Sequence, residues 1–380
     1  MMKRSLSIVL LLALALTLCA CGSSKPEATP APVQEVSAQE TPAESVPAEP
    51  APAEEAAPDP AETLAEAAAL FADGEYEQAL ALCEGVPGAA AILGKSRYLG
   101  LGCEVDHDRA VHDLEQAVEE GSVYSLYLLA DAADKGNGTK QDKDEAARRF
   151  VKFVAAVDGL DASDPEYGPS MAALCDVYAK GRGVEQNDRL ALDAAVKAAS
   201  ASGLSVFDRL GLASFLDSDS HSAVDRARAL TLYEGAEKEL RKLADAGNLR
   251  ALTLLGNLYL DGKGGVEKDY DKALACFTEA AELDYADAQA QVAYMYQNAL
   301  GVEADYSKAM EWNNRAILQG NAQAQAQLGY MYHMGLGVTR NLDTAASWYT
   351  KAAAGGNEFA RKMLEETEVS NPHAYFEAHA

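Results

Sequence analysis

From residue 61 onward, apolar residues recur at spacings of three and four, alanine is frequent and proline is rare. Such spacing places the apolar side chains on one face of a helix. No segment shows the alternation of apolar and polar residues that is typical of a half-buried strand. The pattern therefore predicts an all-α protein beyond residue 60.

The helical pattern also repeats along the chain. The segment LGYMYHMGLGV at residues 328–338 has counterparts that start at Leu93, Leu129, Leu174, Leu255 and Val292, and a degenerate one at Leu210. The successive starts lie 36, 45, 36, 45, 37 and 36 residues apart, which gives seven copies. Because one helix pair cannot bury its own apolar stripe, neighbouring copies must stack into an elongated solenoid.

Each copy is predicted to be a pair of helices. The first helix ends at a Gly-x-Gly-Val turn, and an Asp or Asn such as Asp305 or Asn341 then caps the second helix. The second helix stops at a Gly-Asn pair such as Gly320 and Asn321. The expected copies span residues 89–121, 122–164, 165–203, 204–247, 248–284, 285–320 and 321–356. A helical hairpin (61–88) should precede them, and a capping helix (357–368) and a tail (369–380) should follow.

The repeated words LG-x-MY, G-x-GV, W-x-x-KAA and GN resemble those of the Sel-one-like repeat (SLR), a relative of the tetratricopeptide repeat. The last two copies match nearly residue for residue, and the fourth matches poorly. Residues 61–88 lack the Gly-x-Gly turn and look like an ordinary tetratricopeptide unit instead. The resemblance implies an α/α superhelix whose first helices line a concave face, which members of this family generally use to bind other proteins.

The amino terminus reads as an export signal. Lys3 and Arg4 precede an apolar run, Leu6 to Leu18, that is short for a membrane span. The segment LCACGSS that follows resembles the lipobox of bacterial lipoproteins. The resemblance implies cleavage after residue 20 and a lipid on Cys21; lipidation of Cys19 fits less well. A soluble secreted protein is the alternative. The expected location is outside the cytoplasm, on the outer face of the plasma membrane, or on the outer membrane if the cell has one.

Residues 21–60 are predicted to be a disordered tether. From residue 22 this stretch holds nine of the chain's 13 prolines, eight acids and no aromatic residue. Such a composition cannot bury enough apolar surface to offset the entropy of ordering. The tether should lift the folded part away from the membrane.

Charge and chemistry exclude several functions. The chain carries a formal net charge of −27 without a basic stripe, which argues against nucleic acid as a partner. None of the six histidines stands at a metal-binding spacing. We therefore expect no enzyme, metal or cofactor. A cell-envelope enzyme acting on β-lactams or cell-wall material, as described for some relatives, and a self-associating spacer are the alternatives.

Four cysteines follow the tether. Cys103, Cys175 and Cys276 occupy repeat positions that elsewhere hold Val, Gly and Trp, so we expect them to be small apolar core residues. Cys83 should lie on the apolar side of the hairpin. Whether Cys83 and Cys103 form a disulfide stays open.

The stretch GKGGVEKD (262–269) contains KGGVEK, which differs by one letter from the KGGVGK that opens some phosphate-binding loops. A helix rather than a strand is predicted before it, and Glu267 and Asp269 replace the glycine and hydroxyl residue that a nucleotide loop needs. We interpret it as a repeat turn in which Gly264 or Gly265 is an inserted residue, and we expect no nucleotide.

Candidate binding residues follow from helix geometry. With the glycine of LG-x-MY as position zero and 100° per residue, positions −3, +1 and +4 point away from the packed side. In the last three copies these positions hold Thr253, Asn257, Leu260, Ala290, Tyr294, Gln297, Ala326, Tyr330 and His333. Asn257, Leu260, Tyr294, Gln297, Tyr330 and His333 are the predicted protein-binding surface. The alternative is that Tyr294 and Tyr330 merely stack on each other.

Overall fold

The computed structural model describes residues 59–218 and 220–370, all within one compact unit that spans residues 57–380. The described residues form 18 α-helices and no strand, so the predicted all-α class is confirmed. The predicted signal peptide, the lipidated Cys21, the tether up to residue 58 and the tail beyond residue 370 lie outside the described residues.

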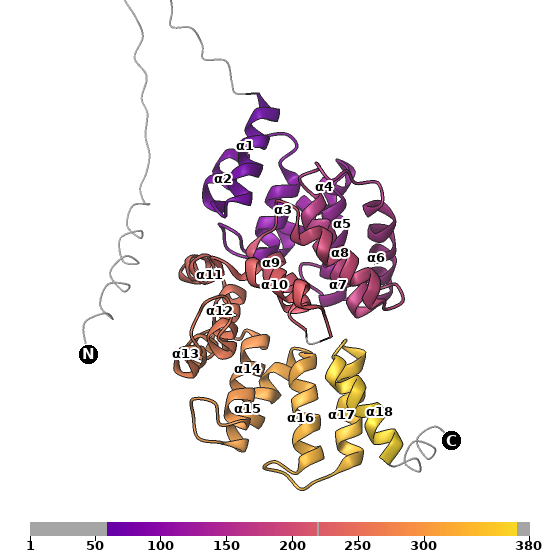
Figure 1. Cartoon of the computed structure of the whole chain (residues 1–380), viewed down its shortest axis with the longest axis vertical. Coiled ribbons are helices and arrows are strands. Elements are labelled where there is room, and N and C mark those ends of the chain that lie inside the picture. The colour runs from indigo at the N-terminus through magenta and orange to yellow at the C-terminus, as the bar shows by residue number, and fades with distance from the viewer. Residues whose placement is uncertain (1–58, 219, 371–380) are drawn as a thin grey trace, which may run out of the picture. The chain divides into compact units, whose positions relative to one another are not determined.

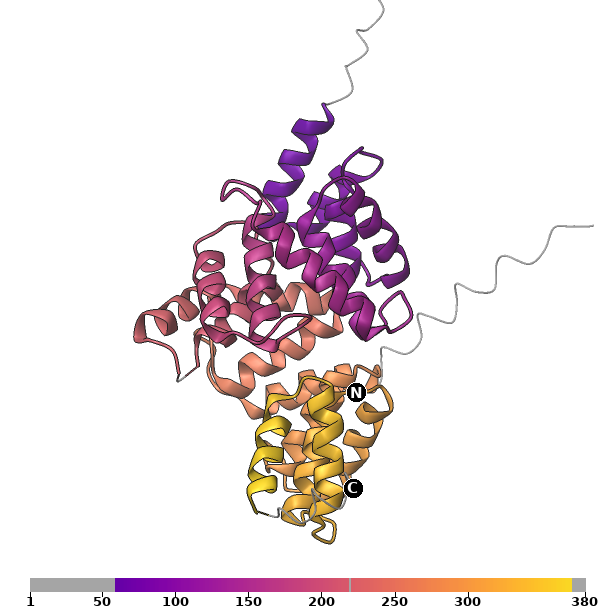
Figure 2. The ribbon, with the colours of Figure 1, turned by 90° about the vertical axis from the view of Figure 1, so that its right-hand side faces the viewer.

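The helices alternate between two roles in the solenoid. The first helices of the successive copies are α3 (Ala90–Leu99), α5 (Val123–Lys135), α7 (Tyr167–Lys180), α9 (Val206–Leu216), α12 (Leu249–Asp261), α14 (Ala286–Gln297) and α16 (Ala322–Met334). The second helices are α4 (His107–Glu119), α6 (Lys143–Val157), α8 (Asp188–Ala199), α10 (Ala223–Tyr233), α13 (Tyr270–Glu282), α15 (Tyr306–Leu318) and α17 (Leu342–Ala354). Each first helix packs against its second helix, and the pairs follow one another side by side (Figures 1 and 2).

Further helices stand at the two ends of the series. Before the first copy, α1 (Pro60–Ala72) and α2 (Tyr76–Cys83) form the hairpin expected there. After the last copy, α18 (Glu358–Ser370) packs on α17 and α16.

Side-chain caps fix where the second helices begin. Asp305 accepts a hydrogen bond of 3.0 Å from the amide of Lys308, and Asn341 accepts one of 2.9 Å from the amide of Thr344. Asp106, Asp142, Asn187 and Asp269 cap α4, α6, α8 and α13 in the same way, and the hydroxyl oxygen of Ser222 caps α10. These bonds satisfy amides that have no partner within the helix, and each stabilises its helix by about 1 kcal/mol.

Each glycine of the Gly-x-Gly turn has its own structural reason, although the sixth copy has Ala299, with φ of 55°, in place of the first. The first, as at Gly335 with φ of 75°, ends the first helix in the left-handed region. The second touches the second helix of the preceding copy, since a Cβ on Gly337 would lie 2.5 Å from the Cβ of Tyr306.

The same contact identifies the insertion in GKGGVEKD. A Cβ on Gly264 would lie 3.1 Å from the Cβ of Tyr233, whereas a Cβ on Gly265 would meet nothing within 4 Å. Gly265 is therefore the inserted residue. The stretch joins α12 to α13 and is a repeat turn rather than the strand-to-helix loop that cradles phosphate.

The fourth copy (204–247) departs from the expected helix pair. A third helix, α11 (Ala236–Asp245), follows α10 and contacts α9, where Arg209 pairs with Glu239. Glu239 also accepts a hydrogen bond of 2.5 Å from the hydroxyl of Tyr76. The superhelix thus brings α11 against the hairpin of α1 and α2.

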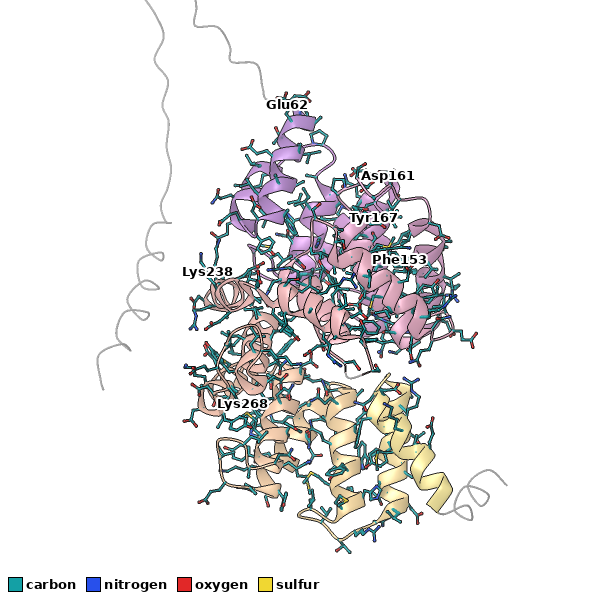
Figure 3. All side chains as sticks on the ribbon, in the orientation of Figure 1. Glu62, Phe153, Asp161, Tyr167, Lys238 and Lys268 are labelled. Atoms are coloured by element: carbon teal, nitrogen blue, oxygen red, sulfur yellow. The ribbon has the colours of Figure 1, made fainter. Side chains whose placement is uncertain are left out.

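The core lies between the two helix layers. Phe150, Phe153, Phe277 and Tyr349 are its large side chains, and fully buried alanines let the helices approach closely. Phe153 lies inside the fold, whereas the exposed Lys238 and Lys268 project from it (Figure 3).

The cysteines match their expected places only in part. Cys83 and Cys175 are buried and Cys276 is half-buried, but Cys103 is exposed, so its predicted core position is wrong. Cys103 stands in the turn after α3, past the helix whose apolar face forms the core. All four are free thiols, including Cys83 and Cys103. No group of three or more His, Cys, Asp or Glu side chains within the described ranges could hold a metal ion.

Candidate functional site

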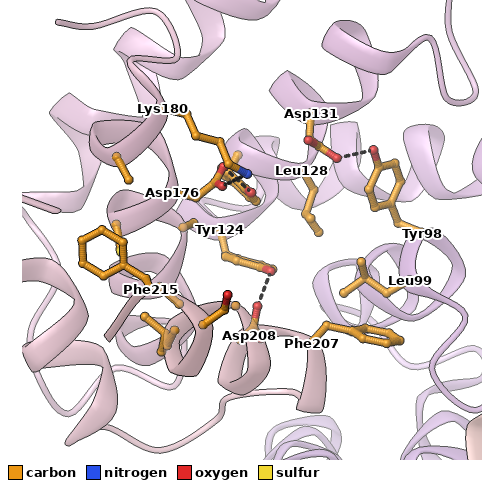
Figure 4. A pocket seen from close by; sticks show the side chains of 18 of the residues that line it. Tyr98, Leu99, Tyr124, Leu128, Asp131, Asp176, Lys180, Phe207, Asp208 and Phe215 are labelled. Carbon is orange, nitrogen blue, oxygen red and sulfur yellow. Dashed lines mark hydrogen bonds and ion pairs between the residues drawn. The ribbon is translucent and has the colours of Figure 1, made fainter. Parts of the chain in front are cut away.

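The first helices of the amino-terminal half enclose a hollow of ≈ 400 Å³, which we name the main cavity. Figure 4 shows it from close by. Its lining includes Tyr98, Tyr124, Tyr127, Asp131, Lys135, Asp176, Lys180, Phe207, Asp208, Phe215 and Arg250. These side chains come from α3, α5, α7, α9 and α12, so the cavity lies along the face that first helices present.

The main cavity follows the positional rule that helix geometry predicts. Counted from the central small residue of each first helix, positions −3, +1 and +4 of the second copy are Tyr127, Asp131 and Asp134. The same positions hold Ala172, Asp176 and Ala179 in the third copy and Asp208, Leu212 and Phe215 in the fourth. All of these except Asp134 line the cavity. The rule would have found this site had it been applied beyond the last three copies.

Arg182 joins three carboxylates beside the cavity. It lies in the turn after α7, and its guanidinium nitrogens are 2.6 Å from Asp131, 2.7 Å from Asp176 and 3.0 Å from Asp134. The guanidinium carbon also lies 4.3 Å from the ring centre of Phe150. Because Arg182 is only 13% exposed, these contacts are shielded from solvent and link α5 to the end of α7.

The charges of this cluster shift the pKa values of its acidic side chains. Burial raises the pKa of Asp176, but the cations Lys180 and Arg182 outweigh it and lower the pKa to about 2. Asp131 behaves alike: burial is opposed by Lys135 and Arg182, and its pKa lies well below the usual range. Both acids are therefore ionised at neutral pH.

Three tyrosines donate to the carboxylates. The hydroxyl of Tyr98 lies 2.8 Å from Asp131, that of Tyr127 lies 3.1 Å from Asp176, and that of Tyr124 lies 3.1 Å from Asp208. Burial, followed by the neighbouring carboxylates, raises the pKa of each tyrosine well above its ordinary value. The phenols therefore remain protonated donors.

Cations complete the pairing of these acids. Asp131 pairs with Lys135 at 2.8 Å, Asp176 with Lys180 at 2.5 Å, and Asp208 with Lys95 at 3.4 Å. Each carboxylate of the main cavity is thus already neutralised from within the protein.

Arg250 is the exception among these charges. Of the charged side chains that line the main cavity, it alone makes no ion pair or hydrogen bond with the described part of the chain. Its guanidinium carbon lies 4.5 Å from the ring centre of Phe207. The side chain is accessible to solvent because the hollow is open, but protein surrounds it on the other sides. Sequence analysis missed it because it stands at position −6, one turn before the positions considered.

A second hollow of ≈ 370 Å³ adjoins the first, and we name it the amide hollow. Ser214 lines both, and α12 contributes Arg250 to the main cavity and Asn257 to the amide hollow. In the amide hollow the Nε2 of Gln291 donates to the Oδ1 of Asn257 at 2.9 Å. The Nε2 of Gln323 donates to the Oε1 of Gln291 at 3.4 Å. Asn257, Gln291 and Gln323 form an amide ladder across three first helices.

The predicted surface residues divide into two groups. Asn257, Leu260 and Tyr294 line the amide hollow together, and Tyr294 is 38% exposed. Gln297 is only 8% exposed, and Thr253, Ala290 and Ala326 are buried, so the expectation that these four are displayed is wrong. First helices of successive copies pack directly on one another, as α14 does on α16, and cover positions at the margin of the stripe.

The last two helices, α17 and α18, pack against the remaining two residues. The ring centre of Tyr330 lies 6.1 Å from that of Phe359 on α18, and both residues are near Tyr349. The ring of His333 is half-buried, 6.2 Å from Tyr349. Tyr330 therefore packs against the end of the solenoid rather than on Tyr294.

The chain matches known proteins over the same helix pairs. The Sel1 repeat family matches residues 87–122, 123–148, 168–201, 249–285, 286–321 and 322–357, together more than half of the chain. Six of the seven predicted copies are thus matched, and the irregular fourth copy (204–247) is not.

Relatives of this chain include proteins of several bacteria. An uncharacterized protein of Neisseria meningitidis serogroup B is 27% identical over 249 residues, which cover 56% of this chain. This chain covers 47% of that protein, about half its length.

Two solved structures are similar as well. One is a protective antigen of uropathogenic Escherichia coli with an SLR fold (26% identity, 82% of this chain, 65% of that chain, TM-score 0.32). Another is a Sel1 repeat protein of Klebsiella pneumoniae (22% identity, 64% of this chain, 99% of that chain, TM-score 0.33). Since the family matches more than half of the residues, in register with the helix pairs, this chain belongs to the Sel1 repeat family.

Proposed function

We propose that this protein is a scaffold, held outside the cytoplasm by a lipid on Cys21, that binds a partner protein or peptide along its first helices. The binding surface consists of the main cavity and the amide hollow. Binding needs no bond-making step: several moderate contacts along one groove act together because the partner segment is held at all of them.

The observation that carries this proposal is the continuity of the two hollows along α12. Arg250 and Asn257 stand on this one helix and face different hollows, and Tyr294 extends the surface onto α14. An exposed Arg and an exposed Tyr are side chains that contribute strongly to protein interfaces, because they bury large contact areas on binding.

The sequence supports the proposed anchor. A short apolar run ends in LCAC and is followed by a Pro/Ala/Glu-rich stretch up to residue 60. Two or three acyl chains hold a protein on a membrane far more firmly than one, since each buried methylene contributes about 0.8 kcal/mol. Within residues 59–218 and 220–370, no helix has the length and hydrophobicity required to cross a membrane.

Site-specific crosslinking in living cells tests the proposal. A photoreactive phenylalanine analogue is placed in the full chain at Tyr294, in the amide hollow, and in a second variant at Lys238, which is exposed on α11. We expect illumination to join one defined protein to position 294 and not to position 238. Identification of the adduct by mass spectrometry names the partner.

Two results would contradict the proposal. A specific adduct formed only at position 238 would place the binding surface at α11, outside both hollows. An adduct at position 294 that consists of two copies of this chain would favour the self-associating spacer.

A further inference from the structure

The main cavity contains one charge that the fold leaves unpaired. Asp131, Asp176 and Asp208 are each held by a lysine and a tyrosine, and Arg182 bridges the first two. A basic partner would have to displace these cations to reach an acid. An acidic partner would meet Arg250, which makes no ion pair in the described residues and is attracted by Asp131 only at longer range.

The position of Arg250 at the start of a helix further favours the binding of an anion. It is the second residue of α12, where the unpaired backbone amides give the helix a positive end. A cation is unfavourable there, and the ring of Phe207 beneath the guanidinium leaves its edge free for hydrogen bonds. A carboxylate placed against that edge would satisfy the guanidinium and the helix end together.

The amide ladder offers a different kind of contact. Asn257 uses its Oδ1 within the ladder, and its Nδ2 has no partner in the described ranges. At the other end Gln323 uses its Nε2, and its Oε1 is without a partner there. The free donor and the free acceptor lie at opposite ends of the ladder, on α12 and α16, so they suit a C=O and an N–H of two different peptide units along an extended backbone.

The spacing of the two features suits an extended chain. Arg250 and Asn257 are seven residues apart on one helix, which places them on the same face about 10.5 Å apart. An extended segment rises about 3.3 Å per residue, so the carboxylate and the held peptide unit would be about three residues apart.

We propose that Arg250 binds the side-chain carboxylate of an Asp or Glu in an extended partner segment whose backbone pairs with the amide ladder. This inference rests on the proposed function and names the chemistry of its ligand. The main cavity extends beyond Arg250 to Tyr98 and Lys180, and the amide hollow extends to the other side. Chain can therefore continue past Arg250 in both directions, which suits a side chain rather than a terminal carboxylate.

Selection from a random library tests the inference. The full chain is presented with displayed nonapeptides that are fused at both ends, so that no free terminus is available. We expect the enriched peptides to share an Asp or Glu at one fixed position. Enrichment without an acidic position overturns this inference but leaves the proposed function standing, whereas a library that yields no binder contradicts both.

A double-mutant cycle then assigns the contact. For one selected peptide with its Glu or the corresponding Gln, fluorescence anisotropy gives the Kd for the wild-type chain and for Arg250→Met. Each single change should weaken binding about 30-fold, and the two together should cost little more than either alone. Fully additive losses would overturn the assignment of the carboxylate to Arg250.

Arg189→Met is the matched control. Arg189 is also exposed and also the second residue of its helix, but α8 is a second helix and does not line either hollow. Its substitution should leave the Kd unchanged. The melting temperatures of both variants establish that they are folded, and a loss of affinity in Arg189→Met equal to that in Arg250→Met would also overturn the inference.

Discussion

The side-chain amide of Asn248 donates a hydrogen bond of 2.8 Å to the carbonyl oxygen of Leu99, 149 residues earlier in the chain. The same amide donates to the carbonyl of Gly100 at 2.8 Å, while its oxygen caps α12 by accepting from Ala251. Asn248 thus caps the carboxy-terminal end of α3 and the amino-terminal end of α12 at the same time. Being 6% exposed, it fixes one turn of the superhelix against the next from inside the fold.

Asn248→Asp should destabilise the protein by about 3 kcal/mol. The carboxylate still caps α12, but it cannot donate, and it faces two carbonyl oxygens in a buried place. Urea unfolding measures the loss. Asn357→Asp is the control, because the Oδ1 of Asn357 caps α18 at Ala360 while its side-chain nitrogen makes no hydrogen bond within the described residues. That variant should change stability by less than about 0.5 kcal/mol, and equal losses in both would contradict the role of Asn248.

The acid cluster around Arg182 makes stability depend on pH in the acid range. The pKa of Asp176 is about 2 in the folded protein, and its ordinary value is 3.8. A lowered pKa contributes stability above the ordinary value, and that contribution is lost as the pH falls towards 2. We expect the free energy of unfolding to drop between pH 4 and pH 2, with about 2 kcal/mol of the drop absent in Asp176→Asn.

Unfolding in urea at several pH values measures this difference. In Asp176→Asn the stability at neutral pH should be lower than in the wild type, and the two should converge as the pH approaches 2. Parallel curves over the whole range would mean that Asp176 gains no stabilisation from Lys180 and Arg182.

Two glycines at the same repeat position should respond to alanine with opposite signs. A Cβ on Gly256 would lie 2.6 Å from the ring of the buried Phe277, whereas a Cβ on Gly211 would meet nothing within 4 Å. Gly256→Ala should cost about 2 kcal/mol through overpacking. Gly211→Ala should gain about 1 kcal/mol, because alanine favours the helix. Thermal unfolding of both variants measures the two changes in stability. A loss of stability in Gly211→Ala would contradict the open space around Gly211.

Periodicity predicted the helix pairs because it reports directly which face of each helix is apolar. It could also fix the direction of positions −3, +1 and +4, and the half-buried Tyr127 and Asp176 line the main cavity from these positions. It could not report whether another helix covers that direction. Gln297 and Tyr330 obey the same angle but lie under neighbouring helices.

The long-range contacts could not be predicted from the sequence for a related reason. Pairs such as Asn248 with Leu99 and Tyr76 with Glu239 depend on how many copies complete one turn of the superhelix. Small rotations at each helix interface set that number, and they accumulate over several copies. The fourth copy was hard to recognise because residues 217–222 hold no glycine where the Gly-x-Gly turn is expected, and because a third helix, α11, follows its helix pair.

The lipid anchor is a prediction from the sequence alone. Cys21→Ala should abolish metabolic labelling with radioactive palmitate, because no cysteine would then stand at the cleavage site to accept the lipid. Cys19→Ala is the control and should still be labelled. Labelling that survives in Cys21→Ala and disappears in Cys19→Ala would move the lipid to Cys19.

Tyr294 and Tyr330 should separate binding from stability. Tyr294 is 38% exposed in the amide hollow, so Tyr294→Ala should weaken capture of the partner and leave the melting temperature nearly unchanged. Tyr330 packs on Phe359 of α18, so Tyr330→Ala should lower the melting temperature by loosening the end of the solenoid. Calorimetry and the crosslinking yield at a second groove position, Leu260, measure the two effects. If both variants lowered stability equally without affecting capture, Tyr294 would be a packing residue and the binding surface would have to lie elsewhere.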